Sequence, residues 1–436
     1  MQIRNIRRPF FVDGIAVKKR SAILPVTSGT SITEHASEVE REISRDVDVS
    51  IIHLVDCLIN RAHVARASDV HFDPRATGIM VRLRIDGVMH DAHFLPLSMQ
   101  HEVVSRIKVL ANLRTDEHQA TQDGRFRHFF KKGEYIDIRV SIAPTYHGEN
   151  VVLRLLSKAE QFSLETLGFS ESDRKKIVAA IERPHGMILA TGPTGSGKTT
   201  TLYTLIKMLN SPEVSIVTIE DPIEYAVDNI EQIQVNPRAG LTFANGLRSI
   251  LRQDPNIIMV GEIRDAETAG IAVNTALTGH LLLSTLHTND ATTTLPRLLD
   301  MGVDSYLVSS IINIAIAQRL VRRICRSCRE EIAVNPAMYE SLSHVKLNIP
   351  IVLGEVFFRG AGCTSCNQSG YAGRVCVNEV LVADADIREK ILLKASAAEL
   401  RAVAIQNGMT PMLEDGLCKV RSGETTIAEI LRVIHE

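Results

Sequence analysis

The chain has 436 residues, of which 45% are hydrophobic and 23% are charged, and this is typical of a globular protein with two or three compact domains. Its 49 basic and 51 acidic residues nearly cancel, which argues against a protein that coats nucleic acid or lies flat on acidic lipid. The N-terminal apolar stretch is broken and is followed by Lys18, Lys19 and Arg20, so we expect no signal peptide. No run of about 18 apolar residues predicts a transmembrane segment. We therefore expect a cytoplasmic protein that reaches a membrane only through its partners.

The first part of the chain predicts an arm and then a mixed α/β module. Residues 1–46 show no sustained period and carry clusters of Ser, Thr and Gly, so we expect an N-terminal arm or small subdomain there. From residue 47 to 157, helical and strand patterns alternate. The clearest are a helical pattern from Val49 to Ala65 and an alternating strand, Val81–Ile85, that runs into a predicted hairpin turn at Asp86-Gly87.

Two polar stretches and a change of pattern lead from this module to a larger α/β domain. We expect a turn at Gln122–Gly124 and a linker at 158–164. Residues 165–436 then predict the larger domain, because strand, loop and helix alternate from 187 to about 286 as in a mostly parallel sheet covered by helices. Its last part holds a cysteine-rich subdomain at about 320–380 and then amphipathic helices.

A glycine-rich loop at Gly192–Thr199 is the strongest functional signal in the chain. It reads Gly-Pro-Thr-Gly-Ser-Gly-Lys-Thr between a buried strand pattern and a helix pattern, which is the GxxxxGK[ST] phosphate loop in its expected context. Its glycines let backbone N–H groups turn toward phosphates, and the helix N-terminus adds partial positive charge. Lys198 supplies a cation to the β- and γ-phosphates of ATP, and the Thr199 hydroxyl is placed to ligate Mg²⁺. The expected nucleotide-binding residues are Gly192, Pro193, Thr194, Gly195, Ser196, Gly197, Lys198, Thr199 and Thr200.

Acidic residues follow two of the predicted strands. Glu220 and Glu224 come at the end of the strand Val214–Ile219, and Glu262 follows the strand Ile257–Val260. Because ligands of open α/β sheets bind beyond the carboxyl ends of the strands, we expect these acids to face the phosphate loop. An acidic surface turn is the alternative, above all for Glu220.

A histidine follows a third predicted strand, Leu281–Leu286. Most histidines at a strand edge are only hydrogen-bonded polar residues. The position at the end of a sheet strand nevertheless makes His287 a candidate sensor of the γ-phosphate.

Four of the seven cysteines form two CxxC pairs. Cys325-Arg-Ser-Cys328 and Cys363-Thr-Ser-Cys366 together offer four thiolates, which suits a closed structural Zn²⁺ site. The odd number of cysteines and the lack of a secretory signal argue against a disulfide framework. A redox-active CxxC remains the alternative.

Three further segments resemble the sequence boxes of the type II secretion and type IV pilus ATPases. Thr218–Tyr225 resembles their aspartate box, Leu251–Asp265 their Walker B signature, and Thr278–Ala291 their histidine box. The similarity extends from about residue 47 to 436. It implies an α/β protein with a RecA-like P-loop ATPase core, a PAS-like α/β N-terminal domain, and a zinc-binding, helical C-terminal part.

The resemblance also implies roles for single residues. Glu224 becomes the candidate for positioning or deprotonating the attacking water, with Glu220 in reserve, and Glu262 becomes the candidate magnesium-side acid. Family members are usually hexamers whose ATP lies between the N-terminal module and the core, where arginines complete the site. By position, Arg139 and Arg154 are the arginines of the module, and an interdomain salt bridge is the alternative for each. The candidates from the core are Arg248, Arg252 and Arg264.

The function that the resemblance implies is a hexameric motor at the cytoplasmic side of a bacterial inner membrane. Such a motor uses ATP hydrolysis to drive an inner-membrane platform protein in type IV pilus assembly or type II secretion. The tetracysteine insertion is typical of the secretion and assembly branch of the family and generally missing from the retraction branch. Asn256 and Cys376 depart from the residues common in the family, and the region before residue 47 is shorter than the docking domain of many members.

Two other classes of function stay open. A nucleic-acid translocase for DNA uptake also has a P-loop, arginines and a zinc knuckle, but the near-zero net charge and 4% aromatic residues offer no basic channel or stacking platform. We therefore expect no direct nucleic-acid binding. The other class is a scaffold that binds nucleotide without hydrolysing it, and the intact Lys198, Thr199, Glu224 and Glu262 argue against it.

Overall fold

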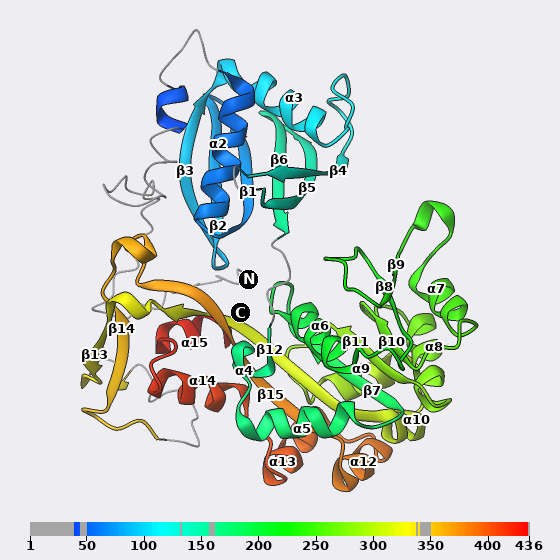
Figure 1. Ribbon diagram of the computed structural model, residues 1–436. Coiled ribbons are helices and arrows are strands. Elements are labelled where there is room, and N and C mark those ends of the chain that lie inside the picture. Colours follow the sequence, from blue (N-terminus) through cyan, green and yellow to red (C-terminus); the bar gives the residue numbers. More distant parts are fainter. Residues whose placement is uncertain are drawn as a thin grey trace, which may run out of the picture. The chain divides into compact units, whose positions relative to one another are not determined.

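The computed structural model shows two compact units (Figure 1). One takes in the chain up to Lys158 and the segment Ile324–Ala372, and the other Ala159–Arg323 and Gly373–Glu436. The predicted arm lies outside the described residues except for a helical stretch at 39–43, and so does most of the predicted linker. No helix among the described residues is both long and apolar enough to cross a membrane. The structure describes residues 39–43, 50–130, 133–156, 162–336, 339–340 and 350–434.

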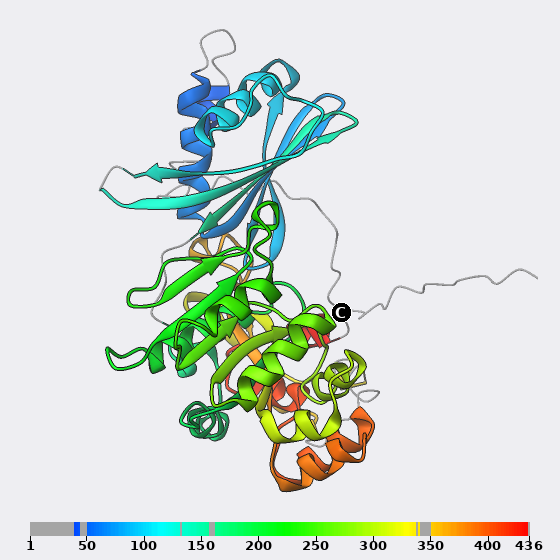
Figure 2. The ribbon, with the colours of Figure 1, turned by 90° about the vertical axis from the view of Figure 1, so that its right-hand side faces the viewer.

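The N-terminal module of the first unit is a six-stranded antiparallel sheet in the order β3-β2-β1-β6-β5-β4. Alternate residues such as Val70, Phe72 and Leu153 are fully buried in one core with residues of α2 and α3, while the other face of each strand stays more open. Figure 2 shows the twist of this sheet. Its elements are α2 (Ile51–Val64), β1 (Ala67–Arg75), β2 (Gly78–Ile85), β3 (Val88–Pro96), α3 (Gln100–Leu110), β4 (Gln122–Phe129), β5 (Tyr135–Thr145) and β6 (Gly148–Leu156).

One predicted turn of this module is confirmed and one is wrong. Asp86 and Gly87 both have positive φ, 49° and 86°, and connect β2 to β3 as a tight hairpin. Gln122–Gly124 does not form a turn but opens β4, where Gln122 lies opposite Ile142 of β5. Residues such as Gln, Asp and Gly are only weakly disfavoured in strands. At this edge strand, the pairing with β5 outweighs their weak preference for a turn.

The second unit is built on a seven-stranded sheet in the order β15-β12-β7-β11-β10-β8-β9. The strands from β12 to β9 run parallel, and β7, β8, β10 and β11 are buried throughout, as in a sheet covered by helices on both faces. The parallel sheet expected between residues 187 and 286 is therefore confirmed, and β12 and β15 extend it with segments that the sequence analysis did not identify as strands.

Helices connect the strands of this sheet and follow it in the chain (Figure 1). The strands are β7 (Gly186–Thr191), β8 (Ile216–Glu220), β9 (Glu231–Gln234), β10 (Ile257–Val260), β11 (Leu281–Leu286), β12 (Ile312–Ile324) and β15 (Tyr371–Val382). The helices are α4 (Leu164–Leu167), α5 (Glu171–Ile181), α6 (Lys198–Leu209), α7 (Phe243–Ile250), α8 (Ala266–Leu277), α9 (Thr294–Asp300), α10 (Ser305–Ile311), α12 (Ala385–Leu392), α13 (Ala397–Gln406), α14 (Met412–Arg421) and α15 (Ile427–Ile434).

Candidate nucleotide site and cysteine cluster

The glycine loop between β7 and α6 has the backbone conformation that a phosphate loop requires. Gly192, Gly195 and Gly197 have φ of 143°, 77° and 90°, values that other residues rarely adopt. A Cβ on Gly192 would also lie 2.5 Å from the carbonyl oxygen of Gln318, whereas a Cβ on Gly195 would meet no atom within 4 Å. The outer side of the loop at Gly195 is therefore open, and glycine is needed there for its conformation alone.

Lys198 begins α6 and is buried beside the loop. Its Nζ donates to the carbonyl oxygens of Gly192 (2.8 Å) and Pro193 (2.9 Å). Burial lowers the pKa of Lys198 to about 8, because the lost hydration and the charge of Arg319 outweigh the attraction of Glu262. The loop therefore holds a partly desolvated cation within electrostatic range of Glu262.

We expect ADP affinity to fall as the pH rises through about 8. Lys198 is an ammonium group below this pKa and neutral above it, and bound phosphates favour the ammonium form. The dissociation constant, measured by calorimetry between about pH 7 and pH 9.5, should rise by up to roughly tenfold per pH unit above pH 8. Lys198→Arg is the control, because a guanidinium group keeps its charge over this range. The same slope in Lys198→Arg as in the wild type would assign the titration to another group.

Glu262 and His287 meet at neighbouring strand ends. Glu262 follows β10 and His287 follows β11, and His287 Nε2 lies 3.1 Å from a carboxylate oxygen of Glu262. Arg264 forms a second ion pair with the same carboxylate. Burial alone raises the pKa of Glu262, but the contacts with Arg264 and His287 outweigh it and leave the pKa below its usual value. The Glu262 side chain therefore favours its ionised form and places a negative charge near Lys198.

Glu220 is held in a separate buried network. It ends β8, and β10 and β11 separate this strand from β7. Its carboxylate accepts hydrogen bonds from the Tyr203 hydroxyl, from Thr218 Oγ1 (2.5 Å) and from Gln232 Nε2 (3.2 Å). Tyr203 belongs to α6, so Glu220 ties the phosphate-loop helix to β8. Glu224 lies in the loop after β8 and is half-buried there.

Arg139 and Arg154 lie in a cationic row on the open face of the N-terminal sheet. Directly paired residues of adjacent strands share a face, and the register places Arg125, Arg139, Arg154, Asp69 and Arg84 in one line across five strands. Asp69 is the one acid in this line, with Arg154 Nε at 3.0 Å and Arg84 Nε at 3.3 Å. The row therefore presents a surplus of positive charge. Arg84 and Arg125 were not predicted as site residues from the sequence, although their alternation along β2 and β4 marks the same face.

β12 and the segment after β11 add residues to the nucleotide site that were not predicted from the sequence. Arg319 is 8% exposed, and its guanidinium nitrogen Nη1 lies 3.2 Å from where a Cβ on Gly192 would stand. Arg319 is thus a second buried cation at the start of the phosphate loop. Thr288, after β11, bonds to Thr191 at the end of β7, with its N–H donating to Thr191 Oγ1 (2.9 Å). No motif marks Arg319, because it reaches the loop only through the pairing of β12 with β7, whereas Thr288 lies within the histidine-box segment Thr278–Ala291.

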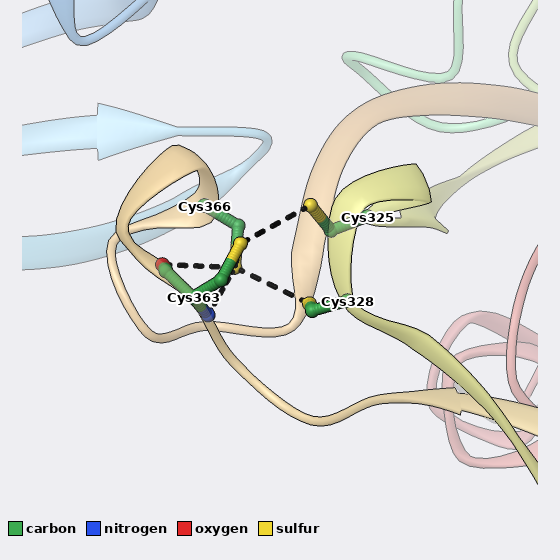
Figure 3. A group of neighbouring side chains, drawn as sticks. All are labelled: Cys325, Cys328, Cys363 and Cys366. Carbon is green, nitrogen blue, oxygen red and sulfur yellow. Dashed lines mark hydrogen bonds between the residues drawn. The ribbon is translucent and has the colours of Figure 1, made fainter.

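The four cysteines of the two CxxC pairs form one cluster in the first unit (Figure 3). Cys325 and Cys328 precede β13 (Arg329–Ala333), and Cys363 and Cys366 follow its antiparallel partner β14 (Val356–Gly360). The sulfur atoms lie 3.8 Å apart in the pairs 325/363 and 328/366, and all four are within 4.8 Å of one another.

This geometry suits a tetrahedral metal ion. Four sulfurs at about 2.3 Å from a central Zn²⁺ lie about 3.8 Å from each other, whereas a disulfide needs about 2.05 Å. The backbone N–H groups of Cys363 and Gly370 point at Cys366 Sγ from 3.2 and 3.3 Å, which stabilises negative charge on that sulfur. The described residues contain no other group of three or more Cys, His, Asp or Glu side chains that is close enough to hold a metal ion.

Comparisons with known proteins show which proteins this chain is similar to. The family described as "Type II/IV secretion system protein" matches residues 44–432. The chain is 44% identical over 415 residues to the type II secretion system protein E of Xanthomonas campestris pv. campestris, covering 95% of this chain and 72% of that protein. It is 44% identical over 376 residues to the type IV pilus assembly ATPase PilB of Thermus thermophilus, covering 86% of this chain and 42% of that protein.

Among solved structures, the chain resembles the pilus retraction motor PilT with bound ADP. The TM-score is 0.60 with 26% sequence identity, and the match covers 86% of this chain and 95% of that chain. The α/β ATPase fold expected from the sequence is thereby confirmed.

Proposed function

The chain belongs to the type II/IV secretion system protein family, and we propose that it is the hexameric ATPase motor of a type IV pilus assembly or type II secretion machine. The observation that carries the proposal is the glycine loop with Lys198, beside which Glu262 and His287 meet. A P-loop ATPase needs this combination, because catalysis of phosphoryl transfer rests on a cradle for the phosphates and fixed charges around them. The motor would drive an inner-membrane platform protein from the cytoplasmic side.

The residues of the loop fit Mg²⁺·ATP. The backbone N–H groups of the loop and Lys198 would hold the phosphates, and the Thr199 hydroxyl together with Glu262 would hold the magnesium side. Magnesium, when bound, neutralises charge on the phosphate oxygens. His287 is proposed to report the presence of the γ-phosphate to Glu262, because its ring already lies at hydrogen-bond distance from that carboxylate.

Glu224 is proposed to position or deprotonate the attacking water. Glu220 is the alternative, but its carboxylate already accepts hydrogen bonds from Tyr203, Thr218 and Gln232 inside the protein. A general base must reach the proton that it removes. This network favours a structural role for Glu220 and leaves catalysis to Glu224.

Glu224→Gln is expected to keep ATP binding and to lower turnover by roughly a hundredfold or more, because the amide cannot accept the proton of the water. The matched variant Glu220→Gln should instead lower the melting temperature, with a smaller effect on turnover. Phosphate release at saturating Mg²⁺·ATP and thermal unfolding measure the two effects. Unchanged hydrolysis by Glu224→Gln would move the water-positioning role to Glu220.

Arg139 and Arg154 are proposed to complete the site within the hexamer. Arginine stabilises charge that spreads over a transferring phosphoryl group, and supplying it from a separate module couples hydrolysis to movement of that module. The row of arginines on the open face of the sheet supports this proposal, since a polyphosphate would neutralise its excess charge.

Steady phosphate release by the assembled protein tests the function as a whole. We expect hydrolysis that requires Mg²⁺ and is stimulated by the platform protein. Hydrolysis stimulated by DNA, with salt-sensitive DNA binding, would favour a translocase instead. A lack of turnover by the assembled wild-type protein would favour a scaffold.

A further inference from the structure

Gln318 is a fully buried amide behind the phosphate loop. It belongs to β12, which pairs in parallel with β7 so that Ala317 lies opposite Thr191, the last residue before the loop. Gln318 therefore lies beside the point where β7 ends and the phosphate loop begins. Its partners there lie more than a hundred residues earlier in the chain.

Both the nitrogen and the oxygen of this amide make hydrogen bonds. Nε2 donates to the carbonyl oxygen of Ser196 (2.9 Å) and lies 3.7 Å from Cys376 Sγ, while Oε1 accepts from Thr201 Oγ1 (2.9 Å). A carbonyl oxygen only accepts hydrogen bonds, so the contact with Ser196 decides which end of the amide faces the loop. Gln318 thereby joins the middle of the loop to the first turn of α6.

The contact with Ser196 orients the peptide groups of the loop. The peptide between Ser196 and Gly197 is trans, and in a trans peptide the C=O and the N–H point in opposite directions. Because the Ser196 carbonyl is held toward Gln318, the Gly197 N–H points to the other side of the loop. N–H groups turned outward in this way are what binds phosphate in a P-loop. A Cβ on Gly197 would lie 3.0 Å from Gln318 Nε2, so the loop also rests directly on this side chain.

We propose that Gln318 is a positioning residue for nucleotide binding, which holds the phosphate loop in the conformation that turns its N–H groups toward the phosphates. The inference rests on the proposed function, since it concerns the same site. Without the amide, the buried Ser196 carbonyl loses its partner. Rotation of the Ser196–Gly197 peptide gives this carbonyl a new partner. The same rotation turns the Gly197 N–H away from the anion.

The test is the ADP affinity of the full-length Gln318→Met variant, which keeps the length of the side chain and removes the amide. We expect the dissociation constant for Mg²⁺·ADP, measured by calorimetry, to rise about tenfold. The KM for ATP should rise by a similar factor while kcat changes less, because the residue acts on binding of the phosphates and not on the attacking water.

Asn313→Leu is the matched control. Asn313 is also a buried amide of β12, but it bonds to the His185 carbonyl and to Arg183, at 3.1 Å each, near the start of β7. Its replacement should lower the melting temperature and leave ADP affinity unchanged. A loss of affinity in the control as large as in Gln318→Met would reduce the effect to general destabilisation and overturn the proposal.

Gln318→Glu adds a measurement that serves also if Gln318→Met fails to fold. The carboxylate form cannot donate to the Ser196 carbonyl, whereas the protonated form can, and burial raises the pKa of a carboxyl group. The ADP affinity of this variant should therefore improve, relative to the wild type, as the pH falls from about 8 to about 6.

Two further results would overturn the proposal while leaving the proposed function intact. One is an ADP affinity of Gln318→Met within about twofold of the wild type, less than the loss of a hydrogen bond produces. The other is a Gln318→Glu variant whose affinity follows the pH profile of the wild type. If the wild-type chain itself bound no ADP, the proposed function would fall, and this inference with it.

Discussion

Replacing Lys198 with alanine is expected to lower kcat/KM for ATP by roughly a thousandfold or more, the effect of removing a key charge from a phosphoryl-transfer site. Lys198 is the cation at the start of α6, and its Nζ already lies against the loop that would hold the phosphates. A methyl group in its place leaves the charge of the β- and γ-phosphates without this partner. Phosphate release at varied Mg²⁺·ATP and ADP calorimetry measure the loss.

Lys175→Ala is the control for this experiment. Lys175 is an exposed lysine of α5 that forms a surface ion pair with Glu171 at 2.8 Å. Such pairs contribute little, so stability and hydrolysis should both stay close to those of the wild type. Hydrolysis by Lys198→Ala within about tenfold of the wild type, in a protein that still unfolds cooperatively, would contradict the assignment of the loop as the ATP site.

Removal of the metal is expected to unfold the cysteine cluster. We propose that Cys325, Cys328, Cys363 and Cys366 hold one structural Zn²⁺, because their sulfur distances match a tetrahedral Zn–thiolate site. Structural zinc contributes on the order of 10 kcal/mol to the folding of isolated sites, which is comparable to the whole stability of a domain. Purified protein should contain one zinc per chain by elemental analysis, and chelation should open the segment around β13 and β14 to proteolysis.

A cysteine replacement separates this role from simple loss of a thiol. Cys363→Ser should lose the zinc and become protease-sensitive in the same segment, whereas Cys418→Ser, at an exposed free cysteine, should keep both properties of the wild type. A wild-type protein without bound metal, or a Cys363→Ser variant as resistant to proteolysis as the wild type, would contradict the metal site.

The local parts of both sites were accessible from the sequence. The phosphate loop was identified because its glycines and Lys198 lie within eight consecutive residues, and the cluster because each CxxC pair spans a single turn. The ends of β7, β8, β10 and β11 were also predicted to within about two residues, since each is an apolar run closed by polar residues. The turn expected at Gln122–Gly124 was wrong, because pairing with β5 outweighed the weak preferences of those residues.

Strand order decided which of the predicted acids stand together. The sequence offered Glu220, Glu224 and Glu262 as members of one site, and nothing in their spacing distinguished them. In the sheet, β10 lies beside β11, so Glu262 meets His287, while Glu220 on the more distant β8 is enclosed by Tyr203, Thr218 and Gln232. A carboxylate's role depends on its burial and partners, and these follow from pairing between strands far apart in the chain.

The sequence by itself indicated a phosphate loop, two CxxC pairs and a parallel sheet, because each of them leaves a local pattern of residue types along the chain. Only the tertiary structure decided that Gln318 and Arg319 stand behind the loop and that four arginines share one row of the N-terminal sheet. Gln318 and Arg319 carry no local signal, and alternation along a strand does not tell which strands are neighbours. These residues come together through the register of hydrogen-bonded strands, and that register is set by which apolar faces are buried across the whole sheet.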